Sequence, residues 1–217
     1  MTLTSQEAAL SGGSGQGDLV VERVTVSFGG LVVLDDVTMS SSKGEVVGVI
    51  GPNGAGKTTL FNVICGFIRP SRGRVIWRGT ELRHHHPHDL ARLGIARSLQ
   101  GVGLFSRLTV LENVIAGAQT GAKAGVVAAT LGLPRSSREE RRLAALAMAT
   151  LDRLGVAEFA SRLPGTLPYP IQKRTALARC LASSPSLLLL DEPTTGLSPE
   201  DLHDLAALIA ELRNETG

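Results

Sequence analysis

The chain has 217 residues, 43% of them hydrophobic, which is enough to bury one substantial core with room for a smaller lobe. Its 22 Lys and Arg residues against 20 Asp and Glu leave a net charge of +2, and 3% of its residues are aromatic. A nucleic-acid partner is not expected, because it calls for a strong basic field or for aromatics that stack on bases. No secretory signal or apolar run of roughly 20 residues is visible, so we expect a soluble chain that reaches a membrane only through a partner.

The N-terminal part of the chain predicts a tail followed by two strands. Residues 1–17 are rich in Gly, Ser and Gln without an apolar period, which is typical of disorder. The fold is expected to begin at residue 18, where VVERVTV and VVLDDVTMS alternate apolar and polar residues on either side of a turn at 28–30. The apolar run from Glu45 to Ile50 then predicts a buried strand of a parallel sheet.

The most specific local motif follows this run. Residues 51–59 read GPNGAGKTT, which satisfies G-x-x-x-x-G-K-[ST] between a predicted strand and a predicted helix. Glycines let backbone N–H groups approach phosphate oxygens, and the helix start adds the positive end of its dipole. We expect Lys57 to contact the β- and γ-phosphates and the Thr58 hydroxyl to ligate Mg²⁺. The predicted nucleotide-binding residues here are Asn53, Gly54, Ala55, Gly56, Lys57, Thr58 and Thr59.

Histidines and a helical region fill the middle of the chain. Clustered imidazoles at 84–86 and 88 could bind Zn²⁺ or Ni²⁺, but a polar loop is the favoured interpretation because no other ligands fix a tetrahedron. Residues 108–163 are rich in Ala, Leu and Arg, and Ser137 with Glu140 forms a capping-box pattern, which predicts helices. Cys65 and Cys180 lack C-x-x-C spacing and are expected to be buried thiols.

An acidic pair follows a second apolar run. Residues 187–190 predict a buried strand, and Asp191 and Glu192 come directly after it, where parallel α/β sheets present their ligands. Asp191 can hold Mg²⁺ through water, and Glu192 can orient or deprotonate an attacking water. The plain alternative, a strand end that meets solvent, loses weight because a phosphate loop lies upstream. Ser198 followed by Pro199 predicts the start of a last helix.

From about residue 18 to the last residue, the sequence resembles the ATPase subunits of ABC transporters, and among them the branched-chain amino acid importer type. GPNGAGKTT and LLLLDEPTTGLSPED resemble the family's phosphate loop and its acidic strand with the D-loop, and IARSLQGVGLFSRLTVLENV resembles its Q-loop region. The resemblance implies an α/β P-loop NTPase core with an antiparallel β sub-domain and an inserted helical sub-domain. It also implies that Gln100 contacts Mg²⁺ and water and that Phe28 stacks on adenine.

The resemblance further implies a domain layout, partners and roles. We expect an ABC ATPase domain over 18–217, with its core at 18–107 and 180–217 and the helical sub-domain at about 108–179. It would hydrolyse Mg-ATP as a peripheral subunit on the cytoplasmic face of the membrane. Its partners would be a second ABC ATPase subunit, in a homo- or heterodimer, transmembrane permease subunits and, indirectly, a periplasmic or extracellular binding protein. The implied catalytic residues are Lys57, Gln100 and Glu192, and the implied metal contacts are Thr58, Gln100 and Asp191.

One segment departs from the family pattern. Residues 167–173 read LPYPIQK, where the resemblance implies an LPYGxQ signature whose Tyr169 and Gln172 lie at the ATP of a second subunit. The expected Gly is Pro170, which has no N–H to donate to a γ-phosphate. A proline early in a helix is tolerated, so the helix is still expected.

The sequence also stops before the strand and the switch histidine with which family members continue, so the C-terminus is expected to be truncated, and His203 is not that histidine. The two departures lead to the hypothesis that the chain binds Mg-ATP but hydrolyses it poorly, as a degenerate subunit would. A non-transport ABC ATPase in DNA repair or translation is a further alternative, although such proteins usually carry coiled-coil insertions or two cassettes.

Overall fold

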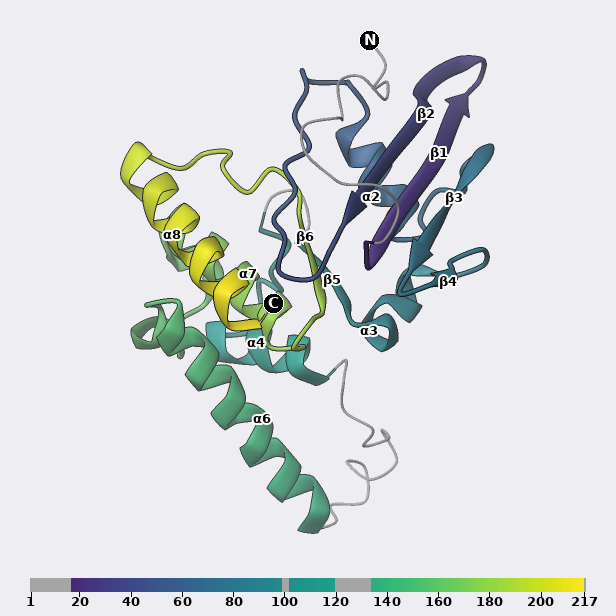
Figure 1. Ribbon diagram of the computed structural model, residues 1–217. Helices are drawn as coiled ribbons and strands as arrows, with labels where there is room; N and C mark the ends of the chain where they lie inside the picture. Colours follow the sequence, from purple (N-terminus) through teal and green to yellow (C-terminus); the bar gives the residue numbers. More distant parts are fainter. Residues whose placement is uncertain (1–16, 99–101, 120–133, 217) are drawn as a thin grey trace. The chain divides into compact units, whose positions relative to one another are not determined.

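The computed structural model describes residues 17–98, 102–119 and 134–216 (Figure 1). The described residues form two compact units, one made of the chain up to Leu90 together with its end from Ala210, and the other of Ala91–Ile209. The boundaries at 17/18 and at about 108 and 179 stay predictions. Among the described residues, no helix is long and apolar enough to cross a membrane.

The first unit contains an antiparallel sheet with the strand order β2-β1-β3-β4. Its strands are β1 (Leu19–Phe28), β2 (Leu31–Ser41), β3 (Arg72–Trp77) and β4 (Thr80–Glu81). β1 and β2 form the predicted hairpin, with the turn at Gly29–Gly30. Val21 and Val24 are both fully buried despite their odd spacing, because a bulge shifts the register between them. The predicted antiparallel β sub-domain is therefore confirmed.

The predicted buried strand at Glu45–Ile50 is wrong for this structure. No strand is assigned to these residues, and Val46 and Ile50 are 58% and 75% exposed. An extended apolar run becomes a strand only when a neighbouring backbone accepts and donates its ladder hydrogen bonds. The helix predicted after the phosphate loop does form: α2 (Lys57–Ile64) buries Leu60, Val63 and Ile64 and contacts β2.

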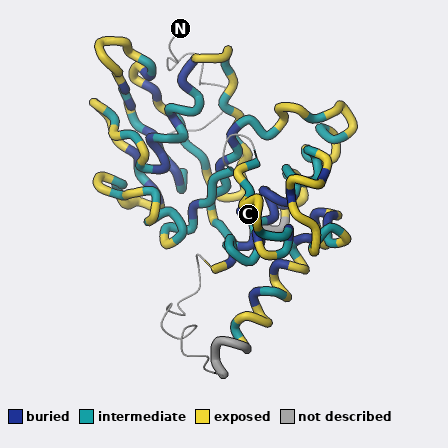
Figure 2. Tube along the Cα trace, turned by 180° about the vertical axis from the view of Figure 1, so that it is seen from behind, coloured by how far each residue is buried: buried dark blue, intermediate teal, exposed yellow. Residues whose placement is uncertain are grey.

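The second unit combines a two-stranded parallel sheet with helices. β5 (Ile95–Ser98) pairs with β6 (Leu187–Leu190), so the second predicted strand is confirmed. Its core consists of apolar residues from α4 (Val110–Gln119), α6 (Pro134–Arg153), α7 (Tyr169–Leu181) and the segments between them. Short turns of helix lie at η1 (Pro87–Asp89) in the first unit, at α3 (Leu90–Leu93), which spans the boundary between the units in the sequence, and at η2 (Ala157–Phe159) and η3 (Pro164–Thr166) in the second unit. Figure 2 shows buried positions recurring along one side of α6, which include Leu143, Ala147 and Leu151.

Two of the predicted helix starts can be compared with the structure, and a third helix has a cap that was not predicted. α6 begins at Pro134, so Ser137 lies inside the helix and its predicted capping box is wrong; proline fits a first helical turn because the N–H it lacks would have no intrahelical acceptor. α8 (Pro199–Thr216) begins as predicted, with Ser198 Oγ accepting a hydrogen bond from the Asp201 N–H at 3.2 Å. A capping box that sequence analysis missed joins Thr109 and Glu112 at the start of α4. Both cysteines are buried thiols, as expected.

Candidate functional site

The phosphate loop folds around the ammonium group of Lys57. Its Nζ atom donates to the carbonyl oxygens of Gly51, at 2.7 Å, and Pro52, at 2.8 Å. The N–H of Ala55 donates to Pro52 O at 3.2 Å, which closes a turn ahead of α2, and Ala55 is buried. The loop is therefore a closed structure with its cation at the first residue of a helix.

Gly56 joins the loop to α2 at a position where only glycine fits. Its backbone has φ +97°, in the left-handed region that side chains rarely adopt. A Cβ atom there would lie 2.8 Å from Leu34 Cδ2 and 2.9 Å from Val33 O, both on β2. The glycine therefore allows α2 to begin in close contact with β2. The first N–H groups of α2 have no acceptors within the helix, so they are available to a ligand bound at the loop.

The residues of this loop fit a polyphosphate. Gly54 has φ +80°, and a Cβ there would meet nothing within 4 Å, so the loop is open at that point. The segment 51–59 supplies backbone N–H groups, the Lys57 cation and two threonine hydroxyls, and it has no carboxylate that would repel an anion. Asn53 is exposed, and Thr58 and Thr59 are half-buried. This donor set matches phosphate oxygens, as the motif predicts.

Phe28 ends β1 directly before the hairpin turn. It pairs with Leu31 across the hairpin, and 49% of it is exposed. A phenyl ring so exposed contributes little to the core. The position therefore fits the predicted stacking on adenine, which stays a prediction.

The acidic pair follows β6 in the second unit, and Asp191 is held by a buried cation. Arg97 Nη2 donates to Asp191 Oδ2 at 2.8 Å, and the two side chains are 8% and 4% exposed. The N–H of Asp191 also donates to Ser98 Oγ at 3.1 Å. β5 and β6 are parallel, and Arg97 and Ser98 pair with the last two residues of β6, so both lie beside Asp191. The buried carboxylate of Asp191 is therefore compensated by the charge of Arg97.

Glu192 has a backbone conformation that is rare for a residue with a side chain. Its φ is +48°, and its carbonyl oxygen accepts a hydrogen bond from the Thr195 N–H at 3.3 Å. The carboxylate oxygen Oε2 accepts from Thr195 Oγ1 at 3.4 Å. Lys173 Nζ donates to the carbonyl oxygens of Glu192 and Pro193. Glu192 thus leaves the strand in a tight turn and is half-buried.

The predicted signature segment forms the start of α7. Pro168 is its N-cap and Pro170 its second residue, where the missing N–H costs no intrahelical hydrogen bond. Gln172 Nε2 donates to Leu167 O at 2.8 Å, so this side chain folds back on its own segment. Tyr169 lies against Gly196 in the loop after Glu192.

The structure groups the predicted site residues in two sets. The residues of the phosphate loop and Phe28 belong to the first unit, whereas Asp191, Glu192, Tyr169 and Gln172 belong to the second. Gln100 lies outside the described residues. Thr58 and Asp191 both offer oxygen donors, the type that Mg²⁺ takes.

Two residues that contact the acidic pair were not found from the sequence. Arg97 gives no local signal, because its role depends on the register of β5 with β6. Lys173 gives none either, because its contacts depend on how α7 packs beside the turn that follows β6.

Residues 34–195 match the model of the ABC transporter family. The chain belongs to this family, whose ATP-binding subunits hydrolyse ATP. It is 40% identical over 197 residues to the high-affinity branched-chain amino acid transport ATP-binding protein BraF of Pseudomonas aeruginosa, covering 91% of this chain and 77% of that one. It is 38% identical over 196 residues to LivG of Escherichia coli, a protein described in the same words, with 90% and 77% covered.

A solved structure supports the same conclusion at the level of the fold. An ATP-binding cassette of an ABC transporter, MJ1267, superimposes with a TM-score of 0.79 at 30% identity, covering 93% of this chain and 79% of that one. The predicted fold class, an ABC ATPase with an antiparallel sheet and helices, is therefore confirmed.

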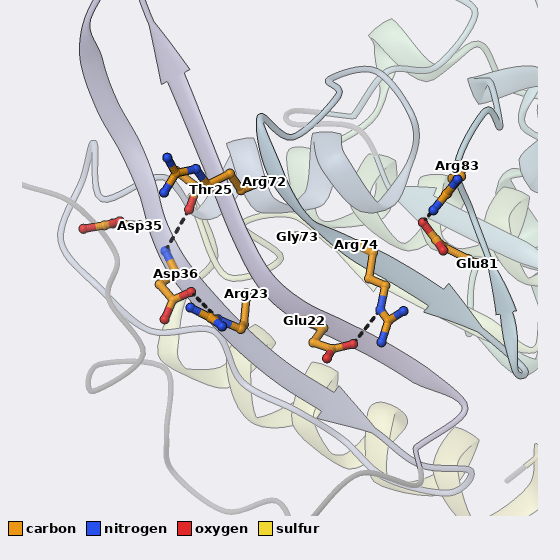
Figure 3. A pocket seen from close by; sticks show the side chains of 10 residues that line it. All are labelled: Glu22, Arg23, Thr25, Asp35, Asp36, Arg72, Gly73, Arg74, Glu81 and Arg83. Atoms are coloured by element: carbon orange, nitrogen blue, oxygen red, sulfur yellow. Dashed lines mark hydrogen bonds and ion pairs between the residues drawn. The ribbon is translucent and has the colours of Figure 1, made fainter.

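The residues that line the concave surface drawn in Figure 3 are not among those that the ABC ATPase motifs predict. This surface encloses about 590 Å³ on the antiparallel sheet and is lined by charged side chains. Figure 3 shows ion pairs among these side chains, which include Arg23 with Asp36 at 3.0 Å and Arg74 with Glu22 at 2.7 Å. The hydrogen bond from Arg74 lowers the pKa of Glu22. Exposed pairs of this kind contribute little to stability, and they give no indication of a ligand.

The clustered histidines at 84–86 and 88 of this ABC ATPase lie in a loop and the short helix η1. The ring of His85 lies between two carbonyl oxygens, with Nδ1 3.1 Å from Leu82 O and Nε2 2.9 Å from Ile64 O. It also fills the space beside Gly66, where a Cβ would lie 2.9 Å from the ring. His85 therefore joins the end of α2 to the segment after β4, which is a structural role.

Proposed function

We propose that the chain is the Mg-ATP-hydrolysing subunit of an ABC importer for branched-chain amino acids or related compounds. The observation that carries the proposal is the closed phosphate loop, with Lys57 at the start of α2 and Gly56 held against β2. The identity of 40% to BraF supports the substrate class, because that relative is described as a branched-chain amino acid transport protein. The non-transport alternative loses weight for the same reason.

The residues around the nucleotide take separate roles in this proposal. Lys57 and the N–H groups at the head of α2 bind the β- and γ-phosphates, and Phe28 stacks on the adenine. Glu192 orients and deprotonates the attacking water, and Gln100 contacts that water and the metal. Thr58, Gln100 and, through water, Asp191 would hold Mg²⁺, which would supply positive charge to the phosphates.

The partners and the location follow from the same proposal. A second ABC ATPase subunit, in a homo- or heterodimer, would receive Tyr169 and Gln172 at its nucleotide. Transmembrane permease subunits would hold the pair at the cytoplasmic face of the membrane as peripheral subunits, and an external binding protein would deliver the substrate. Co-purification with integral membrane proteins is the expected result, and a chain that never associates with them contradicts this part.

Pro170 favours a second candidate, a degenerate nucleotide-binding subunit with impaired hydrolysis. It occupies the second position of α7 and has no N–H to give to the partner's γ-phosphate. A hydrogen bond to a charged group contributes on the order of 1.5–3 kcal/mol, so its loss would weaken closure on the partner's ATP. The defect would then lie in the partner's site and leave Lys57 and Glu192 of this chain unaffected.

Steady-state hydrolysis of Mg-ATP by the purified chain separates the two candidates. For a working ATPase we expect turnover that Glu192→Gln lowers by about 100-fold or more, because it removes the general base. Bound Mg-ATP with background turnover in the parent would favour the degenerate subunit. Turnover that Glu192→Gln leaves unchanged would contradict the role of Glu192.

A further inference from the structure

Lys173 lies in the second turn of α7 and reaches the turn that follows β6. Its Nζ atom donates to Glu192 O at 3.2 Å and to Pro193 O at 2.9 Å. The carbonyl of Glu192 belongs to the peptide unit whose orientation is set by the ψ angle of Glu192. One ammonium group bound to two successive carbonyls therefore constrains the backbone from which the Glu192 side chain leaves.

The backbone of Glu192 needs such a constraint. Its φ of +48° lies in a region that residues with side chains adopt only when surrounding contacts hold them there. Within the turn, the contacts from the Thr195 N–H and hydroxyl to Glu192 measure 3.3 and 3.4 Å, which is long for hydrogen bonds. The shorter contact from Lys173 to Pro193 comes from outside the turn and so can stabilise it.

Tyr169 acts on the other end of the same turn. It precedes Lys173 by four residues, so the two side chains lie on one face of α7, with the Lys173 ammonium 5.3 Å from the centre of the Tyr169 ring. The ring lies against Gly196, where a Cβ would be 2.8 Å from Tyr169 Cε1. Tyr169 and Lys173 thus contact both ends of residues 192–196, which we call the acidic turn.

The surroundings of Lys173 are unfavourable for a surface lysine. Burial lowers the pKa of Lys173, while the Glu192 carboxylate opposes that shift. Its contacts with the acidic turn offset the cost of this burial. A lysine extended into solvent would make none of these contacts.

We propose that Lys173 is a positioning residue for Glu192: by binding two carbonyls of the acidic turn, beside the Tyr169 ring, it aims the Glu192 carboxylate at the attacking water. This inference rests on the proposed function, in which Glu192 acts on that water. It adds a link between the predicted signature helix α7 and the catalytic carboxylate of the same chain.

Three variants of the whole chain test the inference. Lys173→Met removes the ammonium group and keeps an unbranched side chain, and Lys173→Arg keeps a cation that can donate to both carbonyls. Arg174→Met is the matched control, because it removes the adjacent cation of α7, which pairs with the exposed Asp204 at 2.8 Å. Each variant is compared with the parent and with Glu192→Gln in steady-state hydrolysis of Mg-ATP.

Amide hydrogen exchange at Thr195, whose N–H donates to Glu192 O, reports on the acidic turn without requiring turnover.

In Lys173→Met we expect kcat to fall about tenfold to a hundredfold, because misplacing a catalytic group by about 1 Å has an effect of this size. KM for ATP should stay near the parent value, since the phosphate loop is unchanged. Exchange at Thr195 should become faster. Lys173→Arg should recover most of kcat, and Arg174→Met should match the parent in both measurements.

Unchanged exchange at Thr195 in Lys173→Met would overturn the inference, whatever the turnover. Faster exchange with an unchanged kcat, in a chain whose turnover Glu192→Gln abolishes, would overturn the positioning role. Turnover that persists in Glu192→Gln would instead contradict the proposed function, and exchange alone would then decide whether Lys173 holds the acidic turn.

Discussion

The phosphate loop and residues 191–196, which are Asp191 and the acidic turn, are expected to serve one reaction, but different kinds of contact hold them. In the loop, Lys57 bonds to carbonyls five and six residues away. At the end of β6, Asp191 pairs with a residue 94 positions away, and Glu192 is bonded by one 19 positions away. Local contacts are encoded in a short motif, whereas distant ones depend on how strands and helices meet. The acidic turn should therefore be sensitive to substitutions far from it in the sequence.

The largest effect on stability is expected at the buried ion pair. Asp191→Asn leaves the Arg97 charge without its carboxylate in the interior and should lower the free energy of unfolding by about 3–5 kcal/mol. Chemical denaturation measures this. The double variant with Arg97→Met should recover more than about 1 kcal/mol, because the uncompensated charge is then gone. Additive losses from the two substitutions would contradict the coupling.

The phosphate loop should be most sensitive at Gly56. Gly56→Ala combines left-handed backbone strain with overlap against Leu34 and Val33, and should lower the free energy of unfolding by about 2–4 kcal/mol. Gly54→Ala is the matched control, because its φ is also positive while a Cβ there meets nothing within 4 Å. It should cost only the strain, about 1–2 kcal/mol. Equal losses in the two variants would show that the close approach of β2 is unimportant.

Gly196 tests the packing of the acidic turn on α7. Gly196→Ala should cost about 1–2 kcal/mol, because φ is +76° and the new Cβ would lie 2.8 Å from the Tyr169 ring. The ring can shift, so the loss is smaller than at Gly56. In a Tyr169→Ala background the same substitution should cost less, which thermal unfolding of the four proteins can determine. An equal loss of stability in both backgrounds would contradict the contact between Gly196 and Tyr169.

The smallest effect is expected at the cap of α4. Thr109→Ala removes the hydroxyl half of a reciprocal cap with Glu112 and should cost about 1 kcal/mol. Hydrogen bonds from the backbone N–H of Thr109 and then from its hydroxyl lower the pKa of Glu112 below 4.5, so their stabilisation is present above that pH and is lost as the pH falls through the lowered pKa. The substitution removes the part that comes from the hydroxyl. The difference between parent and variant should therefore narrow below pH 4.5 in denaturation curves. A constant or growing difference would contradict this linkage.

The elements that could be predicted from the sequence are those with local signals. The 28–30 turn, the phosphate loop and the start of α8 at Ser198 each depend on residues within a few positions, and the structure contains all three. The start of α6 was missed because the sequence offers two local signals for a helix start, the capping-box pattern at Ser137 and the proline at Pro134. The helix begins at Pro134.

Long-range features could not be predicted in this way. The apolar runs 45–50 and 187–190 look alike in sequence, yet only the second becomes a strand, because β5 pairs with it. The partners of the acidic pair, Arg97 and Lys173, likewise emerge from the register of β5 with β6 and from the face that α7 presents. Such pairings are set by tertiary structure and leave no periodic pattern in the chain.

Binding of Mg-ATP by the parent and by Lys57→Ala, measured by titration calorimetry at one ionic strength, tests the central claim most directly. We predict saturable binding by the parent and a loss of at least about tenfold in affinity in the variant, because a charge-assisted hydrogen bond to phosphate is removed while the fold is kept. Equal affinity in the two proteins, with both folded, would contradict the assignment of residues 51–59 as the nucleotide-binding loop.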